Sequence, residues 1–403
     1  MRSILLRQEK FVALGVAFLT MAVNYGSRST FGLFLKPLEE EFTASRASVS
    51  FILSVIMITY GTLAFFTGYL VDRVGARVVL LIGGASAGMA YLISCHATSL
   101  LQVTISLGVL FGVATCFLSQ ITALSLFVKF PSGANSLALG LVGTAPGIGS
   151  LLLSPFMGAM ITYGSWRSAM EILGGLFLVY LLLPLLLLRQ EKGKRPSRQT
   201  EWVKRSGQGL WSGNKLYLLF SSFLLMSLAI YGVLSQEVAC ATDQGISLTE
   251  AAWALGLVTG IGVISSPLLG WIADRIPSKK KMGAWILALA TVGILFVFMA
   301  RSVFVLALGS IIVGTAYASY VPIFPSITRA LFGSDFFGRA WGFVCMGGSM
   351  GAALGSWLGG YLHDLRGNYD LVWLVMTLSF LAASSTLLMV DDAATEENRP
   401  GHS

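Results

Sequence analysis

The hydrophobic pattern of the chain consists of long apolar runs separated by short polar segments. Twelve runs of about 20 residues can be recognised, near 11–35, 48–70, 77–96, 101–127, 134–160, 169–189, 214–237, 249–271, 283–300, 303–327, 338–361 and 370–390. A helix of this length rises about 30 Å, which is the thickness of the hydrocarbon core of a bilayer. The pattern therefore predicts an all-α membrane protein with twelve transmembrane helices.

The composition supports a chain that lies in the lipid bilayer. Of the 403 residues, 55% are hydrophobic and 11% are charged, and the mean hydropathy is +0.77. Soluble domains carry about 25% charged residues. The 4 cysteines stand singly and the 3 histidines lie at helix ends or in the tail, so we expect no catalytic residues, no metal site and no cofactor. The composition therefore argues against an enzyme.

The formal net charge of +8 does not require a nucleic-acid partner. If the N-terminus is cytoplasmic, 21 of the 27 Lys and Arg residues fall on predicted cytoplasmic segments, 5 fall outside, and Arg28 lies within a helix. Cytoplasmic loops of membrane proteins carry such an excess of basic residues. The distribution predicts a multi-pass protein of the cell membrane with both termini in the cytoplasm.

The chain is expected to form two halves. Residues 189–215 are the longest polar stretch, so we predict six-helix bundles at 1–189 and 214–403 joined by a cytoplasmic linker at 190–213. The linker's basic residues fit the charge rule, and binding of a partner or of anionic lipid is the alternative. "GYLVDRVGAR" at 68–77 is echoed by "GWIADRIPSK" at 270–279. Parallel six-helix repeats of this kind build transporters with a substrate site between pseudo-symmetric halves.

Small residues recur every four positions on two predicted helices. They are Gly347, Gly351, Gly355 and Gly359 on the eleventh, and Gly262, Ser266 and Gly270 on the eighth. Small faces let helix backbones approach closely in a membrane. We expect tight packing at most of these positions, and the same smooth faces would also allow helices to slide.

The loop after the second helix of each half carries the most specific motif. Gly68, Asp72, Arg73, Gly75 and Arg77 match the G-x-x-x-D-R-x-G-x-R loop of the major facilitator superfamily, which the chain resembles along its whole length. Within it, the chain is similar to the bacterial monocarboxylate-porter and oxalate:formate-antiporter branch, at residues 25–50, 241–252 and 336–369. The resemblance implies a monomeric secondary active transporter of small organic anions that works by alternating access, with a proton as an optional partner.

Charges in these loops are interpreted as a cytoplasmic gate. An acid at a helix end with arginines nearby can form charge-assisted bonds to a facing helix N-terminus and release them in another state. The residues are Asp72, Arg73, Arg77, Asp274 and Arg275. The alternative is that they set only the orientation of the chain in the membrane.

The chain departs from this branch where its carboxylate carriers bind anions. Its members place an arginine on the eighth helix, where this chain has Ser266, and the animal members add an Asp where it has Gly262. The lysine that the oxalate exchanger carries on the eleventh helix is missing between Arg339 and His363. The usual anion receptor and proton relay are therefore absent from their usual places.

Arg28 is then the one cation predicted inside the bundle, and we expect it to bind a substrate carboxylate. The first, fourth, seventh and tenth helices line the cavity in the resembling fold. The further substrate-binding candidates on them are Asn24, Tyr25, Gln120, Tyr231, Gln236, Tyr317 and Tyr320, and Glu237 is the candidate coupling site. Tyr317 and Tyr320 precede Pro322 and Pro325, where a helix kink is expected.

Several alternatives stay open. Arg28 could be neutralised by Glu237, extend to the outer surface, or bond to carbonyls near Gly26 and Gly32. The protein could instead be an exporter of amphiphilic small molecules, which an aromatic and methionine-rich cavity would favour. A receptor of transporter-like fold that binds a ligand without moving it is a third possibility, and it would need a signalling domain or an interaction tail.

Overall fold

The computed structural model describes residues 2–126, 136–188 and 214–390, and the described part is helical. The first half contains α1 (Arg2–Ser29), η1 (Thr30–Phe34), α2 (Leu35–Phe42), α3 (Arg46–Val74), α4 (Ala76–Cys95), α5 (Leu100–Val103), the π-helical η2 (Thr104–Phe111), α6 (Gly112–Phe117), α7 (Gln120–Ser125), α8 (Ser136–Tyr163), α9 (Trp166–Tyr180) and α10 (Leu182–Leu187). The second contains α11 (Asn214–Asp243), α12 (Leu248–Gly260), α13 (Gly262–Ala273), α14 (Lys279–Phe298), α15 (Val303–Ser319), α16 (Ile323–Arg366) and α17 (Asp370–Leu388).

The membrane fold predicted from the sequence is confirmed. Within the described residues, 10 helical stretches are long and apolar enough to cross a membrane. The other two predicted spans, near 11–35 and 338–361, are also helical and belong to α1 and to the later part of α16. The linker predicted at 190–213 lies outside the described residues.

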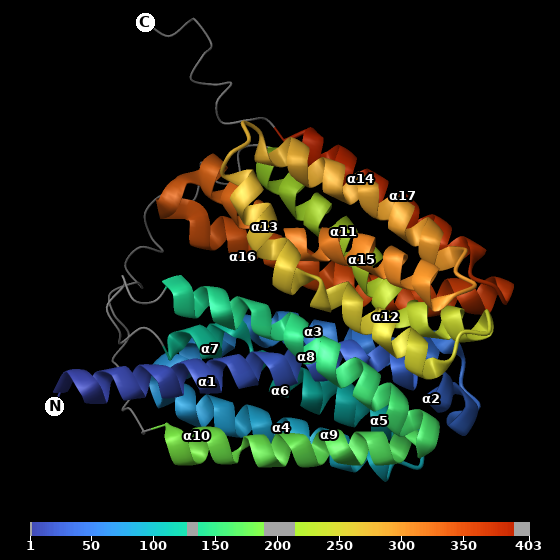
Figure 1. Cartoon of the computed structure of the whole chain (residues 1–403), viewed down its shortest axis with the longest axis horizontal. Coiled ribbons are helices and arrows are strands. Elements are labelled where there is room, and N and C mark those ends of the chain that lie inside the picture. The colour runs from blue at the N-terminus through green and yellow to red at the C-terminus, as the bar shows by residue number, and fades with distance from the viewer. Residues whose placement is uncertain (1, 127–135, 189–213, 391–403) are drawn as a thin grey trace, which may run out of the picture.

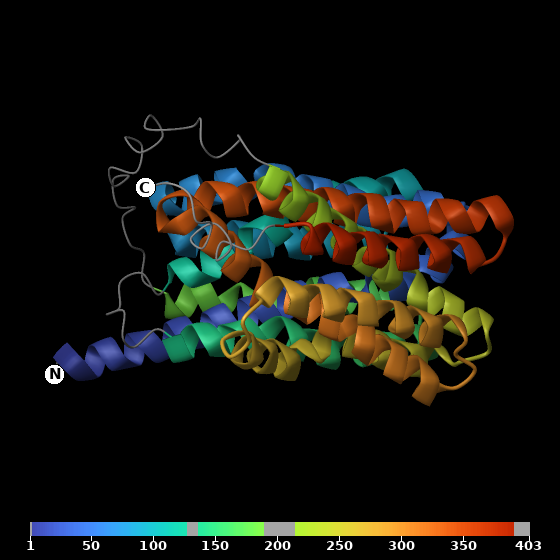
Figure 2. The same ribbon diagram turned by 90° about the horizontal axis from the view of Figure 1, so that it is seen from above.

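The helices of both halves run roughly along one direction, with the first half below the second in Figure 1 and the same alignment visible from above in Figure 2. We call the end of the bundle that holds the start of α1 and the α3–α4 junction the near end. The opposite end, with the α2–α3 and α11–α12 junctions, is the far end. The ribbons of the two halves diverge toward the near end (Figure 1).

Breaks in the long helices occur where the sequence offers a reason. The predicted kink is confirmed, because α15 ends at Ser319 and α16 begins at Ile323, on either side of Pro322. A second break lies inside α16 at Gly333, whose φ of 67° is a left-handed conformation that glycine adopts readily. This break separates the tenth predicted span from the eleventh.

Small residues hold neighbouring helices in backbone contact, as the four-residue spacing predicts. A Cβ atom added to Gly351 or Gly355 of α16 would lie 2.0 Å from the carbonyl oxygen of Leu224 or Leu228 of α11. On α13, the Ser266 hydroxyl donates to the Ala318 carbonyl of α15 at 2.9 Å. Gly351 and Gly355 have no room for a side chain, whereas a Cβ at Gly262 or Gly270 would make ordinary contacts at 3.5 and 3.6 Å. The spacing therefore serves backbone packing on α16 more than on α13.

The two halves touch in the middle and at the far end of the bundle. The Ser54 hydroxyl on α3 donates to the Ala353 carbonyl on α16 at 2.6 Å, and Gln236 of α11 donates to the Ser50 hydroxyl at 3.0 Å. Toward the near end, no atom beyond the local backbone of the same helix lies within 4 Å of the position that a Cβ would take at Gly68 or Gly143. The halves are therefore closed at the far end and separated at the near end.

The close contact between α11 and α16 predicts that Gly355→Ala destabilises the protein. The new methyl would meet the Leu228 carbonyl at 2.0 Å, and overpacking of this kind costs about 1–3 kcal/mol. We expect the melting temperature of the purified protein to fall by roughly 1–4 °C. The control is Gly342→Ala on the same helix, where no atom lies within 4 Å and stability should hold. Equal melting temperatures for both variants would contradict the tight contact.

Candidate functional site

Arg28 lies at the end of α1, inside the bundle. It is 9% exposed, and its guanidinium carbon lies 4.4 Å from the ring centroid of Tyr25 and 6.0 Å from that of Tyr231. Within the described part of the chain, the guanidinium has no acidic partner and no hydrogen-bond acceptor. Contact with two aromatic faces attracts the charge but leaves the N–H donors free. The site therefore holds a buried cation without a counterion.

A cavity of about 140 Å³ adjoins Arg28 on the side of the second half. Its walls come from α1, α3, α11, α15 and α16. The lining residues are Tyr25, Arg28, Met57, Tyr60, Phe223, Met226, Ser227, Tyr231, Tyr317, Tyr320, Cys345, Gly348, Ser349 and Ala352. Among these described residues, Arg28 alone is charged. A smaller cavity of about 40 Å³ lies on the other side of Arg28 and shares Tyr25, Tyr231 and Tyr317 with the first.

The structure thus brings together five of the residues that the sequence proposed for substrate binding, namely Arg28, Tyr25, Tyr231, Tyr317 and Tyr320. Tyr317 and Tyr320 meet with ring centroids 5.5 Å apart, just before the break at Pro322. Sequence reasoning missed Tyr60, Phe223 and the two methionines that complete the wall. In the sequence, these residues appear only as aromatic or thioether side chains within apolar runs. Such side chains are equally typical of helix packing, so they did not indicate a cavity wall.

Three other predicted binding residues lie elsewhere. The Asn24 amide is buried and donates to the carbonyls of Thr115 and Leu118, at 3.3 and 3.1 Å, near the end of α6. Gln120 begins α7 after a break in the fourth span and is exposed. Gln236 is buried between the halves and bonded to Ser50. None of the three is among the described residues that line the Arg28 cavity.

Glu237 is buried within the second half and does not pair with Arg28. The Ser310 hydroxyl of α15 donates to its Oε1 atom at 2.5 Å, and its Oε2 atom has no hydrogen-bond partner in the described part of the chain. The alternative in which Glu237 neutralises Arg28 is therefore not realised in this structure. The alternative in which Arg28 extends to the outer surface is not realised either, because the side chain is buried.

The proposed gate residues make contacts only within their own halves, as far as the structure describes them. Arg73 donates to the Tyr69 hydroxyl at 3.4 Å, and Arg77 donates to the Leu185 carbonyl at 2.7 Å. Arg275 lies over the Trp271 ring at 3.8 Å, and Asp274 lies 3.7 Å from Lys279. The side chain of Asp72 lies outside the described residues. These contacts agree with the separation of the halves at the near end.

A polar network that sequence reasoning missed joins the halves at the far end. Asp243 of α11 accepts from Lys36 at 2.5 Å and from the Tyr369 hydroxyl at 2.6 Å. Arg46 at the start of α3 donates to Tyr369 and lies 3.8 Å from Asp243. Asp364 of α16 accepts from the backbone amides of Arg46 and Ala47, at 3.1 and 2.7 Å. The sequence showed these charges only as loop residues, because their partners are distant in the chain.

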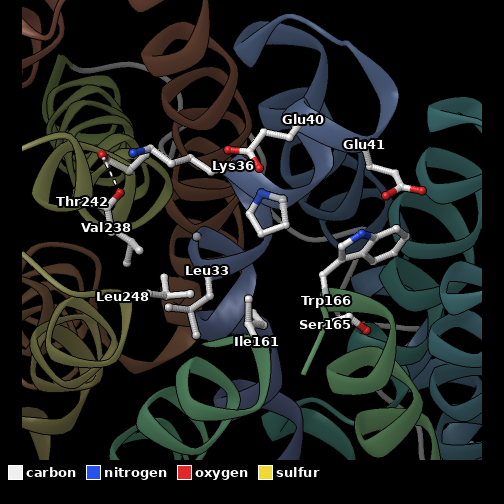
Figure 3. Close-up of a pocket in the computed structure, with 13 residues that line it drawn as sticks. Leu33, Lys36, Glu40, Glu41, Ile161, Ser165, Trp166, Val238, Thr242 and Leu248 are labelled. Carbon is white, nitrogen blue, oxygen red and sulfur yellow. Dashed lines mark hydrogen bonds between the residues drawn. The ribbon is translucent and has the colours of Figure 1, made fainter. Parts of the chain in front are cut away.

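The largest of the described cavities, about 540 Å³, opens at the far end beside this network. In Figure 3, Lys36, Glu40 and Glu41 surround its outer part, while Leu33, Ile161 and Leu248 line its inner part. Arg167 donates to Glu41 at 2.7 Å and holds the pKa of that carboxyl below its usual value. Lys36 and Glu41 are held in ion pairs and Glu40 is exposed, so the buried Arg28 marks the better candidate for ligand binding.

The far-end cavity and the smaller Arg28 cavity are separated by a contact between the halves. Gly32 of η1 lines both the far-end cavity and the smaller Arg28 cavity. A Cβ at Gly32 would lie 2.6 Å from the Leu234 carbonyl of α11, so no space remains between these backbones. The Arg28 site is therefore closed from the far end in this structure.

Comparison with known proteins gives a consistent assignment of family. The family model of the Major Facilitator Superfamily matches residues 17–236 and 218–403. Monocarboxylate transporter 13 of Rattus norvegicus is 27% identical over 383 residues, covering 92% of this chain and 86% of that protein. The uncharacterized MFS-type transporter YcxA of Bacillus subtilis is 24% identical over 408 residues, covering 95% of each.

Solved structures show the same fold. A mutant of the nucleoside transporter NupG superposes with a TM-score of 0.78 at 14% identity, covering 95% of this chain and 99% of that one. A bacterial homologue of the lysosomal transporter Spinster, in an inward-facing and unoccupied conformation, superposes with a TM-score of 0.68 at 14% identity, covering 95% of each.

The far-end network predicts that Asp243→Asn loosens the contact between the halves. The substitution weakens the cross-half contacts to Lys36 and Arg46, and partly exposed ion pairs contribute up to about 1 kcal/mol each. We expect roughly a fivefold increase in molecules with an open far end. Spin labels at the exposed positions Glu40 and Arg301, one in each half, would report the distance distribution.

The matched control is Glu41→Gln, which removes an ion pair with Arg167 inside the first half. It should leave the distribution unchanged. If Asp243→Asn also leaves it unchanged, the network does not hold the far end closed.

Proposed function

Because the chain belongs to the major facilitator superfamily, we propose that it is a secondary active transporter of small organic anions, with monocarboxylates as the substrate class. Relatives named monocarboxylate transporters, which cover most of its length, support this class. The pocket of the proposed site lies between the two halves, where transporters built from parallel repeats bind their substrates.

One observation carries the choice of an anion: Arg28 is buried beside the central cavity without a counterion in the described chain. A charge inside a membrane protein is costly and marks a ligand or ion pathway. A carboxylate fits the planar guanidinium through two parallel hydrogen bonds. The substrate carboxylate would thus be the compensating charge when the site is occupied.

The closed far end and the separated near end support transport by alternating access. The excess of basic residues on one side of the predicted topology supports a cytoplasmic near end, and the structure would then correspond to an inward-open state. Closing the near end would bring the loops with Asp72, Arg73 and Arg77 and with Asp274 and Arg275 toward the facing half. Opening the far end would break the contacts of Asp243 and Arg46.

Glu237 is the proposed proton site if transport is proton-coupled. It is buried in α11, about 9 Å along the helix beyond Tyr231 of the cavity wall, and its Oε2 atom, which has no partner in the described chain, can carry a proton. A buried carboxyl is more stable neutral than charged, so protonation and conformation can be linked. The Ser310 bond fixes its other oxygen.

Export of amphiphilic compounds is the second candidate function. The cavity wall favours it, because six aromatic side chains and two methionines surround the single charge. Such a transporter would move large apolar compounds without a carboxylate. Binding that needs the carboxylate and Arg28 would separate the two functions.

We predict that Arg28→Gln weakens monocarboxylate binding by roughly 30-fold or more, because loss of a buried charge-assisted pair costs about 2–5 kcal/mol. Arg28→Lys should recover only part of this, since an ammonium lacks the planar fork. Calorimetric titration of the purified variants with lactate, pyruvate, formate and oxalate would measure it, and oxalate should gain little from its second charge. Arg301→Gln removes an exposed arginine outside the site and is the control. Binding by Arg28→Gln within about threefold of the parent would return Arg28 to a structural role.

Glu237→Gln should abolish accumulation driven by a pH step while sparing substrate exchange, because the amide cannot take up the proton. Uptake of labelled lactate into proteoliposomes, with and without the pH step, measures both. Glu171→Gln, an acid-to-amide change on the exposed face of α9, is the matched control. Accumulation that persists in Glu237→Gln would remove this residue from coupling.

A further inference from the structure

The wall of the cavity opposite Arg28 is aromatic, and a very small anion bound to Arg28 would not contact it. Phe223 of α11 lies eight residues before Tyr231, which is about 12 Å along the helix toward the near end. Its ring centroid lies 6.1 Å from that of Tyr320 and 5.8 Å from that of Trp341. The Phe223 ring also packs directly against Gly348 of α16, where an added Cβ would lie 2.3 Å from the ring. The cavity thus runs from a cation to a fixed aromatic surface.

Polarisable side chains complete this distal wall. Met57 of α3 and Met226 of α11 line the cavity together with Cys345 of α16. Thioether sulfur makes favourable contacts with aromatic rings, and methionine adapts its shape to a planar group. Flat faces are also supplied by Tyr60 and Tyr320. These residues suit a ring better than a methyl or hydroxymethyl group.

We propose that the preferred substrate is a monocarboxylate with a planar, apolar body, of the arylalkyl carboxylate class, bound with its carboxylate on Arg28 and its ring among Met57, Phe223 and Met226. The inference rests on the proposed function, because it uses the same cavity and the same cation. A lactate-sized anion would satisfy Arg28 but would leave the apolar wall in contact with water, and burial of that wall is favourable. The ring therefore adds affinity that a short anion lacks.

The charge pattern separates this class from others. A dicarboxylate would place its second charge against the apolar wall, where the described lining offers no cation. An organic cation with the same ring would meet the positive charge of Arg28. An uncharged aromatic alcohol would leave the guanidinium without a counterion. The site is thus matched to one carboxylate joined to one apolar body.

Calorimetric titration of the purified full chain with phenylacetate, lactate and benzyl alcohol tests the proposal. We expect phenylacetate to bind at least tenfold tighter than lactate, and benzyl alcohol to bind more weakly than phenylacetate. Cys345→Phe fills the distal part of the cavity and should weaken phenylacetate binding at least tenfold more than lactate binding. Met346→Phe adds the same side chain at the next, exposed position and is the control.

The outcomes distinguish this proposal from the proposed function. Equal affinities of the parent for phenylacetate and lactate, with both lost in Arg28→Gln, would overturn the aromatic preference and keep the anion site. Carboxylate binding that is insensitive to Arg28→Gln would overturn both. If Cys345→Phe does not fold, the ratio measured on the parent decides the question alone. Equal losses for both anions in Cys345→Phe would also count against the ring position.

Discussion

Close contact between helix backbones is the constraint on which this structure depends. Lipid chains are as apolar as the side chains of the helices, so the hydrophobic effect gives little drive for one helix to bind another. Contact must come from close packing, and Gly351 and Gly355 supply it by placing α16 against the carbonyls of α11. Gly149 of α8 does the same against Ala22 of α1. With these pairs fixed, the remaining helices have well-defined places around the central cavity.

The same packing explains how a charged side chain can be held in the interior. Gly26 and Gly32 flank Arg28, and each lies in contact with a neighbouring backbone, so this part of the chain has little freedom to carry the guanidinium toward solvent. Tyr25 and Tyr231 cover its faces. The surroundings offer attraction through aromatic rings but no full countercharge. A site built this way is ready to accept an anion and gains little from any neutral group.

The sequence was sufficient for the membrane fold, because length and hydropathy of a helix are properties of consecutive residues. Arg28 was found for the same reason, since a charge interrupts an apolar run visibly. The partner of Asn24 could not be predicted. Helical spacing puts Asn24 on the same face as Arg28, but it does not show whether that face packs against α6 or lines the cavity at this position. The far-end network was missed since Asp243 and Arg46 meet only after both halves have folded. Phe223 and Met226 gave no signal distinct from packing.

The carboxylate of Asp364 caps the start of α3 from the other half of the molecule, and this has an electrostatic consequence. A helix N-terminus carries unsatisfied amides and partial positive charge, which its own half normally neutralises. Here the Arg46 and Ala47 amides depend on an acid of α16. Any separation of the halves at the far end leaves these two amides without that acid, whereas the Arg46 guanidinium keeps its partner Glu39 of the same half at 2.8 Å. The opened mouth would then expose the partial positive charge of a helix start, which favours an anion at the entrance.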